Sequence, residues 1–209
     1  MSTSRTRLIV VALISCLATA VVMLLVTSAS APPGDASPEA GFSRDMAVHH
    51  AQAVEMSFAV RDASTDERVR TLAYDIITTQ TAQRGIFMGW LQQWELTQAG
   101  TRPSMAWMAG HGHGRAAPAG GRMPGMATDE EMDRLEAARG KDAEILFFQL
   151  MIRHHEGGVQ MAEALLTLSS RDEVRTMARH IVQSQSGEIK FMTELLKARG
   201  GQPYPSILK

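Results

Sequence analysis

An internal repeat constrains the fold of this chain more than any other feature. The segment Phe42–Met56 recurs 105 positions later as Phe147–Met161, and the register continues without a gap from residues 46–91 to residues 151–196. Shared positions include Val54 with Val159, Val69-Arg70-Thr71 with Val174-Arg175-Thr176, Ile76 with Ile181, and Gln80 with Gln185. A duplication of this length predicts two copies of one structural unit that bury their apolar faces together.

Each copy carries one apolar seam if the repeated segment is helical. Along the seam the steps are 4, 3, 4, 3 and 4 residues, which is the spacing of a single buried helix face. The second histidine of each pair, His50 or His155, is rotated by about 100° and is expected at the edge of the seam. The seam residues are Phe42, Met46, His49, Ala53, Met56 and Val60 in the first copy, and Phe147, Met151, His154, Gly158, Met161 and Leu165 in the second.

The seam histidines have two possible interpretations. Methionine and aromatic residues at helical spacing usually form a core, and a single histidine among them is usually a hydrogen-bonded core residue. Both copies, however, carry Met-x-x-His-His followed by a second methionine. Neutral imidazole and thioether are both ligands for soft or borderline metals such as copper, so the doubled motif favours a metal site.

The N-terminus predicts export. Arg5 and Arg7 precede an uncharged apolar run from Leu8 to Val26, and Ala29-x-Ala31 follows it, which predicts a secretory signal cleaved after Ala31. The run is also just long enough to span a bilayer, so an uncleaved anchor with a cytoplasmic N-terminus stays open. In either case the rest of the chain is expected outside the cytoplasm: secreted, periplasmic or at the cell surface.

Composition narrows the chemistry of the exported part. The one cysteine, Cys16, lies inside the apolar run, so neither disulfides nor thiolate ligands are expected beyond residue 31. A soft-metal site there must use methionine and histidine. Without residues 1–31 the net charge is −3, because two arginines and no acids are removed. No basic patch stands out, so nucleic acid is not an expected partner.

The chain is expected to contain one all-α domain, because no stretch alternates polar and apolar residues with period two. Turn residues and caps divide the chain into segments, of which the loop is rich in Met, His and Gly. These are a signal or anchor over 1–31, a proline-rich, non-helical spacer over 32–40, a first helical hairpin over 41–98, the loop over 99–127, a second hairpin over 128–199 opened by a capping box at Thr128, and a tail over 200–209.

Two duplicated hairpins predict a four-helix bundle around a pseudo-two-fold axis. Such an axis brings the helices of His49 and His154 into the same core. Gln80 and Gln185 lie about as far after their hairpin turns as the seam histidines lie before them, so each glutamine shares a level with a histidine. They could hold the second ring nitrogen of a metal-bound histidine, or they could be solvated residues on a helix face.

The motif Phe-x-x-x-Met-x-x-His-His-x-x-x-x-x-Met resembles the signature of a bacterial family named domain of unknown function 305. The resemblance covers residues 41–199 apart from the loop. It implies an exported protein of ferritin-like fold in a family with copper-linked members. By this resemblance the candidate metal ligands are Met46, His49, His50, Met56, Met151, His154, His155 and Met161.

The sequence departs from true ferritins in a way that bears on the metal. Ferritin-type di-iron sites use Glu-x-x-His pairs, and that pattern does not occur here. An oxygen-activating di-iron centre is therefore not expected. Asp45, one turn before His49, could orient that histidine or bind a hard ion, or could be a solvated neighbour.

The loop provides a second candidate metal tract. Its methionines and its His-x-His pair lie among Gly, Pro and Ala residues that offer little else to build a core. A flexible connector with incidental methionines is the simpler interpretation, but short copper-binding tracts have this composition. Trp107 could shield the metal or dock on the bundle. The candidate ligands are Met105, Met108, His111, His113, Met123 and Met126.

Three functions are consistent with these patterns. The first is a non-enzymatic, exported protein that binds Cu(I) for storage, buffering or tolerance, with Cu(II), silver or zinc as other possible guests. The second is a metal-dependent redox enzyme of ferritin-like fold, although nothing in the sequence indicates a substrate. The third is an anchored helical module that binds a partner protein. The membrane is expected to be contacted only through the N-terminal segment, and a homo-oligomer is compatible with all three.

Overall fold

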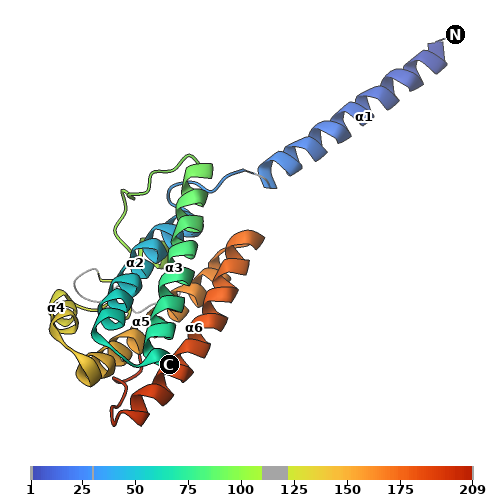
Figure 1. The fold of residues 1–209 in the computed structure, drawn as a ribbon. Coiled ribbons are helices and arrows are strands. Elements are labelled where there is room, and N and C mark those ends of the chain that lie inside the picture. Colours follow the sequence, from blue (N-terminus) through green and yellow to red (C-terminus); the bar gives the residue numbers. More distant parts are fainter. Residues whose placement is uncertain (1, 30, 110–121, 209) are drawn as a thin grey trace. The chain divides into compact units, whose positions relative to one another are not determined.

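The computed structural model describes residues 2–29, 31–109 and 122–208, with side chains from 4–24 in the first segment. These residues form six α-helices and one 3₁₀ turn without a β-strand, which confirms the all-α prediction (Figure 1). The chain divides into two compact units, Met1–Pro33 and Gly34–Lys209. The first unit holds α1 (Ser2–Ala29). Within the described residues, Ser4–Leu24 is the one stretch long and apolar enough to cross a membrane, and a signal sequence has the same properties.

The second unit is a helical bundle. Its first pair of helices is α2 and α3, its second pair is α5 and α6, and α2 also packs against α5 (Figure 1). The helix bounds are α2 (Pro38–Ala63), α3 (Glu67–Gln93), α4 (Asp129–Ala137), α5 (Gly140–Leu168) and α6 (Asp172–Ala198), with η1 (Ala106–Met108) between α3 and α4. Short α4 is opened by the predicted capping box, in which Thr128 and Glu131 bond each other's backbone N–H.

Two helix ends differ from the sequence expectation. Helix α2 begins at Pro38, inside the expected spacer, because Ser37 caps it by accepting from Ala40 N and a first-turn proline has no N–H to satisfy. Helix α3 stops at Gln93, before the expected end near residue 98. Glu95 there has a left-handed φ of 58°, and Leu96 N donates to Leu91 O, which closes the helix end.

The two halves of the repeat bond each other through equivalent residues. Ser64, after α2, donates to the carboxylate of Glu144 at 2.5 Å, and Ser169, after α5, donates to the carboxylate of Glu39 at 2.5 Å. Each serine and each glutamate lies 105 positions from its counterpart. Both pairs are buried, and they join each end of α2 to the opposite end of α5.

Two apolar clusters fill the bundle, one toward each end. The first joins the start of α2 and the end of α3 to the end of α5 and the start of α6, and the second joins the opposite ends of the same four helices. Between the clusters, each of the four helices carries buried or partly buried polar side chains. This polar layer comprises His49 and His50 on α2, Gln80 and Gln83 on α3, His154 and His155 on α5, and Gln185 and Glu188 on α6.

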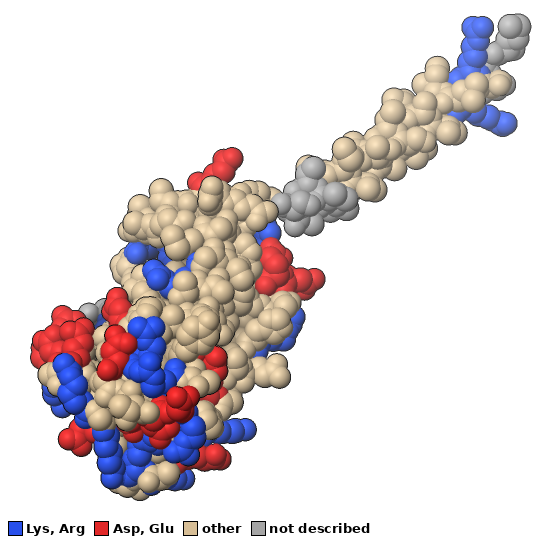
Figure 2. All heavy atoms as spheres, in the orientation of Figure 1, with Lys and Arg blue, Asp and Glu red and all other residues tan. Residues whose placement is uncertain are grey.

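The surface is unevenly charged. Figure 2 shows Lys, Arg, Asp and Glu mixed over the part of the bundle near α4 and the end of α6, and few charges over the end of α3. The sequence agrees, because Arg84 is the one charged residue between Asp75 and Glu95. The visible face of the bundle thus carries both signs of charge close together.

Candidate metal centre

The two seam histidines meet at the centre of the bundle. The ring centroids of His49 and His154 are 3.7 Å apart with the ring planes tilted by 32°, and neither ring is exposed. Every other seam residue is buried as well, as the heptad-like spacing predicts. The two copies of the motif therefore converge in one core.

The second histidine of each pair is more buried than the sequence indicates. His50 and His155 are fully inaccessible, whereas their 100° offset predicts the seam's edge. The reason is that the hairpin partners cover them. His50 Nε2 donates to Gln83 Oε1 on α3 at 2.7 Å, and His155 Nε2 donates to Glu188 Oε2 on α6 at 2.5 Å.

Three of the four histidines present the same unpaired nitrogen. His49 Nε2 donates to Pro124 O at 3.1 Å, so His49, His50 and His155 all use Nε2 as the donor. Their Nδ1 atoms are buried without a hydrogen-bond partner among the described residues. Neither ring nitrogen of His154 has a partner at hydrogen-bond geometry, although the backbone of His49 is near enough to act against the fall in its pKa. A neutral imidazole that donates from one nitrogen offers a lone pair at the other, which is the form that binds a metal.

Burial keeps three of these rings neutral, those of His49, His50 and His154. Loss of hydration lowers the pKa of His49 to about 4 and the pKa of His50 to about 3, and it brings the pKa of His154 well below its usual range. The neighbouring histidines act in the same direction, because each disfavours a positive charge on the next. At neutral pH no proton competes for the unpaired nitrogens of these three rings.

Gln80 and Gln185 lie in the same layer but do not act as expected. They are 3% and 2% exposed, so they are not solvated helix-face residues. Neither amide bonds a histidine, and all four amide atoms lack a partner among the described residues. A Cβ placed on Gly158 would be 2.3 Å from Gln185 Oε1, so the amide lies directly over α5, one turn beyond His154.

The four motif thioethers flank the histidines on both sides. Met46 and Met161 belong to the first apolar cluster, Met56 and Met151 belong to the second, and none is exposed. No group of three or more His, Cys, Asp or Glu suited to a metal occurs in the described part of the chain. A metal site in this layer therefore needs methionine or amide ligands beside histidine.

Asp45 holds the loop and not a histidine. Its Oδ2 accepts from Met105 N and from Trp107 Nε1, both at 2.8 Å. Burial raises the pKa of this carboxyl, and the two donors act against that rise. Trp107 also meets the ring of Phe42 edge-on, with centroids 5.8 Å apart, so it docks on the bundle.

The loop methionines are part of the core in the described residues. Met105, Met108 and Met123 are buried in the first apolar cluster, and Met126 packs against it. The expectation that the loop lacks residues able to form a core is wrong, because its thioethers and Trp107 pack with residues of α2 in the first apolar cluster. His111 and His113 lie outside the described residues.

The end of the loop reaches the histidine layer. Pro124 O accepts from His49, and a Cβ placed on Gly157 would lie 2.0 Å from that same oxygen. Gly125 has φ of +75°, and its Cβ would lie 2.3 Å from Arg153 O. Glycine at both positions lets segment 123–127 lie directly on α5.

The C-terminal tail also packs on α5. Glu156, next to His155, accepts from Ser206 Oγ at 2.7 Å and from Ile207 N at 2.8 Å. The guanidinium of Arg153 lies 5.3 Å from the ring centroid of Tyr204. The sequence predicted only a tail over 200–209 and did not predict this contact.

Sequence reasoning also missed Gln83 and Glu188. They occupy equivalent positions of the repeat, three residues after Gln80 and Gln185, which is almost one helical turn. The available signal was that each lies 33 residues after the second histidine of its own copy. The rotation of α3 and α6, which the sequence does not fix, decided between the two positions.

Comparison with solved structures gives the same fold. The crystal structure of a DUF305 protein from Streptomyces coelicolor, described as secreted, is 46% identical, covers 82% of this chain and 99% of its own, and has a TM-score of 0.75. A DUF305 fragment from Deinococcus radiodurans is 32% identical, with 80% and 99% coverage and a TM-score of 0.65.

A third similar structure holds metal. CopM in its Cu(II)-bound form is 29% identical, covers 78% of this chain and 97% of its own, and has a TM-score of 0.59. CopM also has Cu(I)-bound and Ag-bound forms. The search of curated proteins gave no match. The family model for "Domain of unknown function (DUF305)" matches residues 39–196, and the chain therefore belongs to the DUF305 family.

Proposed function

We propose that this chain is an exported, non-enzymatic copper-binding protein that holds Cu(I) between histidine nitrogens and methionine sulfurs in the core of a ferritin-like bundle made of two duplicated hairpins. Its role is to store or buffer copper, or to confer tolerance to copper. Copper bound by CopM, a structure of similar fold, supports the choice of metal. The signal-like apolar N-terminus and the secreted relative support export, by cleavage or with α1 as an anchor.

The observation that carries this proposal is the set of unpaired ring nitrogens at the centre of the bundle. Both nitrogens of His154 and Nδ1 of three further histidines are buried without a hydrogen bond in the described structure. An unpaired buried polar atom costs about 1–3 kcal/mol, so several in one layer would strongly destabilise a purely structural core. A bound cation satisfies such lone pairs.

The donor set fits a soft ion. The layer offers buried imidazoles, and four buried thioethers belong to the two apolar clusters on either side of it. Thioether and imidazole together favour Cu(I) over Mg²⁺ or Ca²⁺, which prefer oxygen ligands. Met46, His49, His50, Met56, Met151, His154, His155 and Met161 are the proposed ligand pool, and the loop residues Met105, Met108, His111, His113, Met123 and Met126 are a proposed second tract.

Competition titration with a chromophoric Cu(I) chelator tests this proposal on the full-length chain. Met→Leu at positions 46, 56, 151 and 161 conserves core volume and should cost less than about 1.5 kcal/mol per site, so the variant folds while losing its thioethers. We expect the four-fold Met→Leu variant and the His49→Ala, His154→Ala variant to lose the tight Cu(I) site.

Two control variants separate this site from other histidines. His180→Ala removes an exposed histidine on α6 and should leave Cu(I) affinity unchanged. The pair His111→Ala, His113→Ala removes only the loop histidines and should spare the core site. Unchanged stoichiometry and affinity in the core variants, with intact thermal transitions, would eliminate the core site.

A further inference from the structure

The two halves of the histidine layer are chemically unequal although the repeat makes them geometrically equivalent. In the second half the ring of His155 donates to the carboxylate of Glu188, and in the first half the ring of His50 donates to the amide of Gln83. Both partners occupy the same place in the repeat and on their helices. Only the charge of the partner differs.

The next residue of each helix adds to the difference. Arg84 follows Gln83, and its charge is close enough to disfavour a proton on His50. The equivalent residue after Glu188 is Ile189, which packs against the second apolar cluster. At these two pairs of equivalent positions the first half carries a positive charge, on Arg84, and the second half a negative charge, on Glu188.

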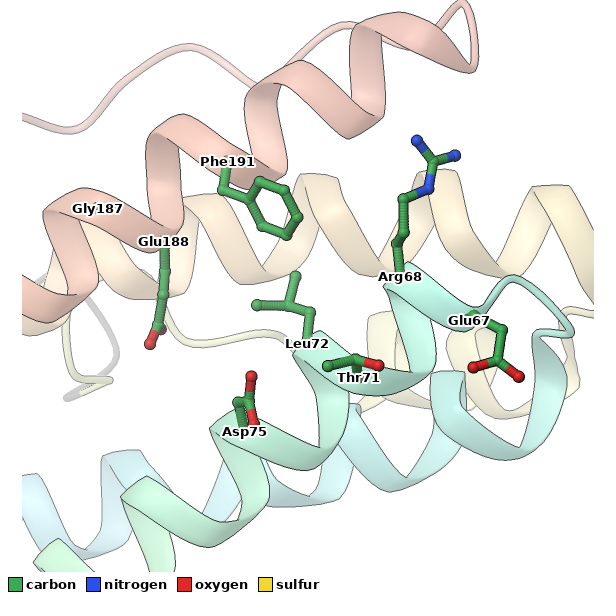
Figure 3. A pocket seen from close by; sticks show the side chains of 8 residues that line it. All are labelled: Glu67, Arg68, Thr71, Leu72, Asp75, Gly187, Glu188 and Phe191. Atoms are coloured by element: carbon green, nitrogen blue, oxygen red, sulfur yellow. The ribbon is translucent and has the colours of Figure 1, made fainter.

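Glu188 also connects the layer to the surface. A groove of about 490 Å³ lies between α3 and α6, and Glu188, Asp75, Leu72 and Phe191 are among its lining residues. Figure 3 shows the Glu188 side chain extending from α6 toward α3, where Asp75 lies. The Glu188 side chain is 24% exposed while His155 is not exposed at all. Glu188 thus both lines the groove and bonds the buried ring of His155.

We propose that the two halves bind metal unequally: His155, positioned by Glu188, binds a soft cation through Nδ1 before His50, which is positioned by Gln83 and lies near Arg84. This inference rests on the proposed function and adds an order of filling to it. Glu188 is a positioning residue that acts through His155.

The physical reason is the charge behind each ring. A carboxylate that accepts the Nε2 proton increases the electron density at Nδ1 and offsets the charge of a bound cation, and an amide does this less. Loss of such a partner commonly lowers metal affinity by about 10- to 100-fold. Repulsion from Arg84 weakens binding at His50 further. An affinity difference of at least about 10-fold between the halves is therefore expected.

Histidine-labelled, full-length chain titrated with Ag(I), which is diamagnetic, tests the order by ¹H–¹⁵N NMR. In the wild type the His155 Nδ1 signal should move at a lower silver concentration than the His50 Nδ1 signal. Glu188→Gln should weaken silver binding at His155, and Gln83→Glu should strengthen silver binding at His50. Each substitution should reduce the difference in affinity between the two histidines. The double exchange should remove or reverse the order. Each exchange places a side chain of similar size at a partly exposed position, so folding is preserved.

The outcomes distinguish the two proposals. Without metal, both rings should carry the proton on Nε2, and Nδ1–H tautomers would overturn the positioning role independently of any metal. Silver that binds the layer with His50 and His155 moving together, or with an order that the exchanges leave unchanged, would overturn the inequality alone. Silver that moves none of the four layer histidines would overturn both this inference and the proposed function.

Discussion

Substitution of Gly157 by alanine tests how the loop is seated on the histidine layer. The added Cβ would lie 2.0 Å from Pro124 O, and that backbone oxygen is also the acceptor of His49 Nε2. The methyl group cannot be accommodated by rotating a flexible side chain, so segment 123–127 must move away from α5. The His49 hydrogen bond should then be lost.

The magnitude follows from three effects. Overpacking costs about 1–3 kcal/mol, and the lost hydrogen bond adds about 0.5–1.5 kcal/mol. Alanine in a helix interior regains about 0.8–1.0 kcal/mol relative to glycine. Gly187→Ala is the matched control, because Gly187 lies inside α6 with nothing within 4 Å of an added Cβ. It receives the helix gain alone.

The difference between the two variants therefore isolates the contact. We expect Gly157→Ala to be less stable than Gly187→Ala by about 1.5–4.5 kcal/mol, which is the sum of the overpacking and hydrogen-bond contributions. That corresponds to roughly 3–18 °C in the thermal midpoint for a domain of this size. Urea unfolding and thermal melts of the metal-free chain measure it, and the His49 Nε2 signal in NMR reports the lost partner. Equal midpoints for the two variants would show that the loop does not rest on α5.

Two further predictions concern the metal-free chain. Burial lowers the pKa of His49 to about 4 and the pKa of His50 to about 3, from an ordinary 6.5. Between the lowered and the ordinary pKa of each ring, the unfolded state therefore binds more protons than the folded state. The free energy of unfolding should fall as pH drops below about 6.5, by about 1.4 kcal/mol per pH unit for each ring. Urea midpoints at pH 7 and pH 5 measure this, and His49→Gln should flatten the slope; a pH-independent midpoint would contradict it. Ser169→Ala should destabilise the fold by about 1–3 kcal/mol, because Glu39 then has no side-chain partner in the described structure. The equivalent substitution Ser64→Ala should cost less, because Arg199 Nε still donates to Glu144 at 2.5 Å. Equal losses in thermal melts would exclude this role of Arg199.

Much of the fold could be read from the repeat. The seam from Phe42 to Val60 and its second copy were predicted residue by residue, because one face of a long helix has a fixed spacing of 3 and 4. The meeting of His49 with His154 followed from symmetry, and the capping box at Thr128 from local chemistry. These features depend on short-range geometry or on the duplication, and both can be read directly from the sequence.

The tertiary structure alone decided what surrounds each histidine. The choice of Gln83 and Glu188 as partners depends on the rotation of α3 and α6 about their own axes, which packing fixes and sequence spacing does not. The sequence also does not predict the hydrogen bond from His49 Nε2 to Pro124 O, because it does not fix the path of the loop that carries Pro124. The sequence by itself established a duplicated helical chain with a signal-like N-terminus and two Met/His motifs. Only packing showed that its four motif imidazoles are buried and have unequal hydrogen-bond partners.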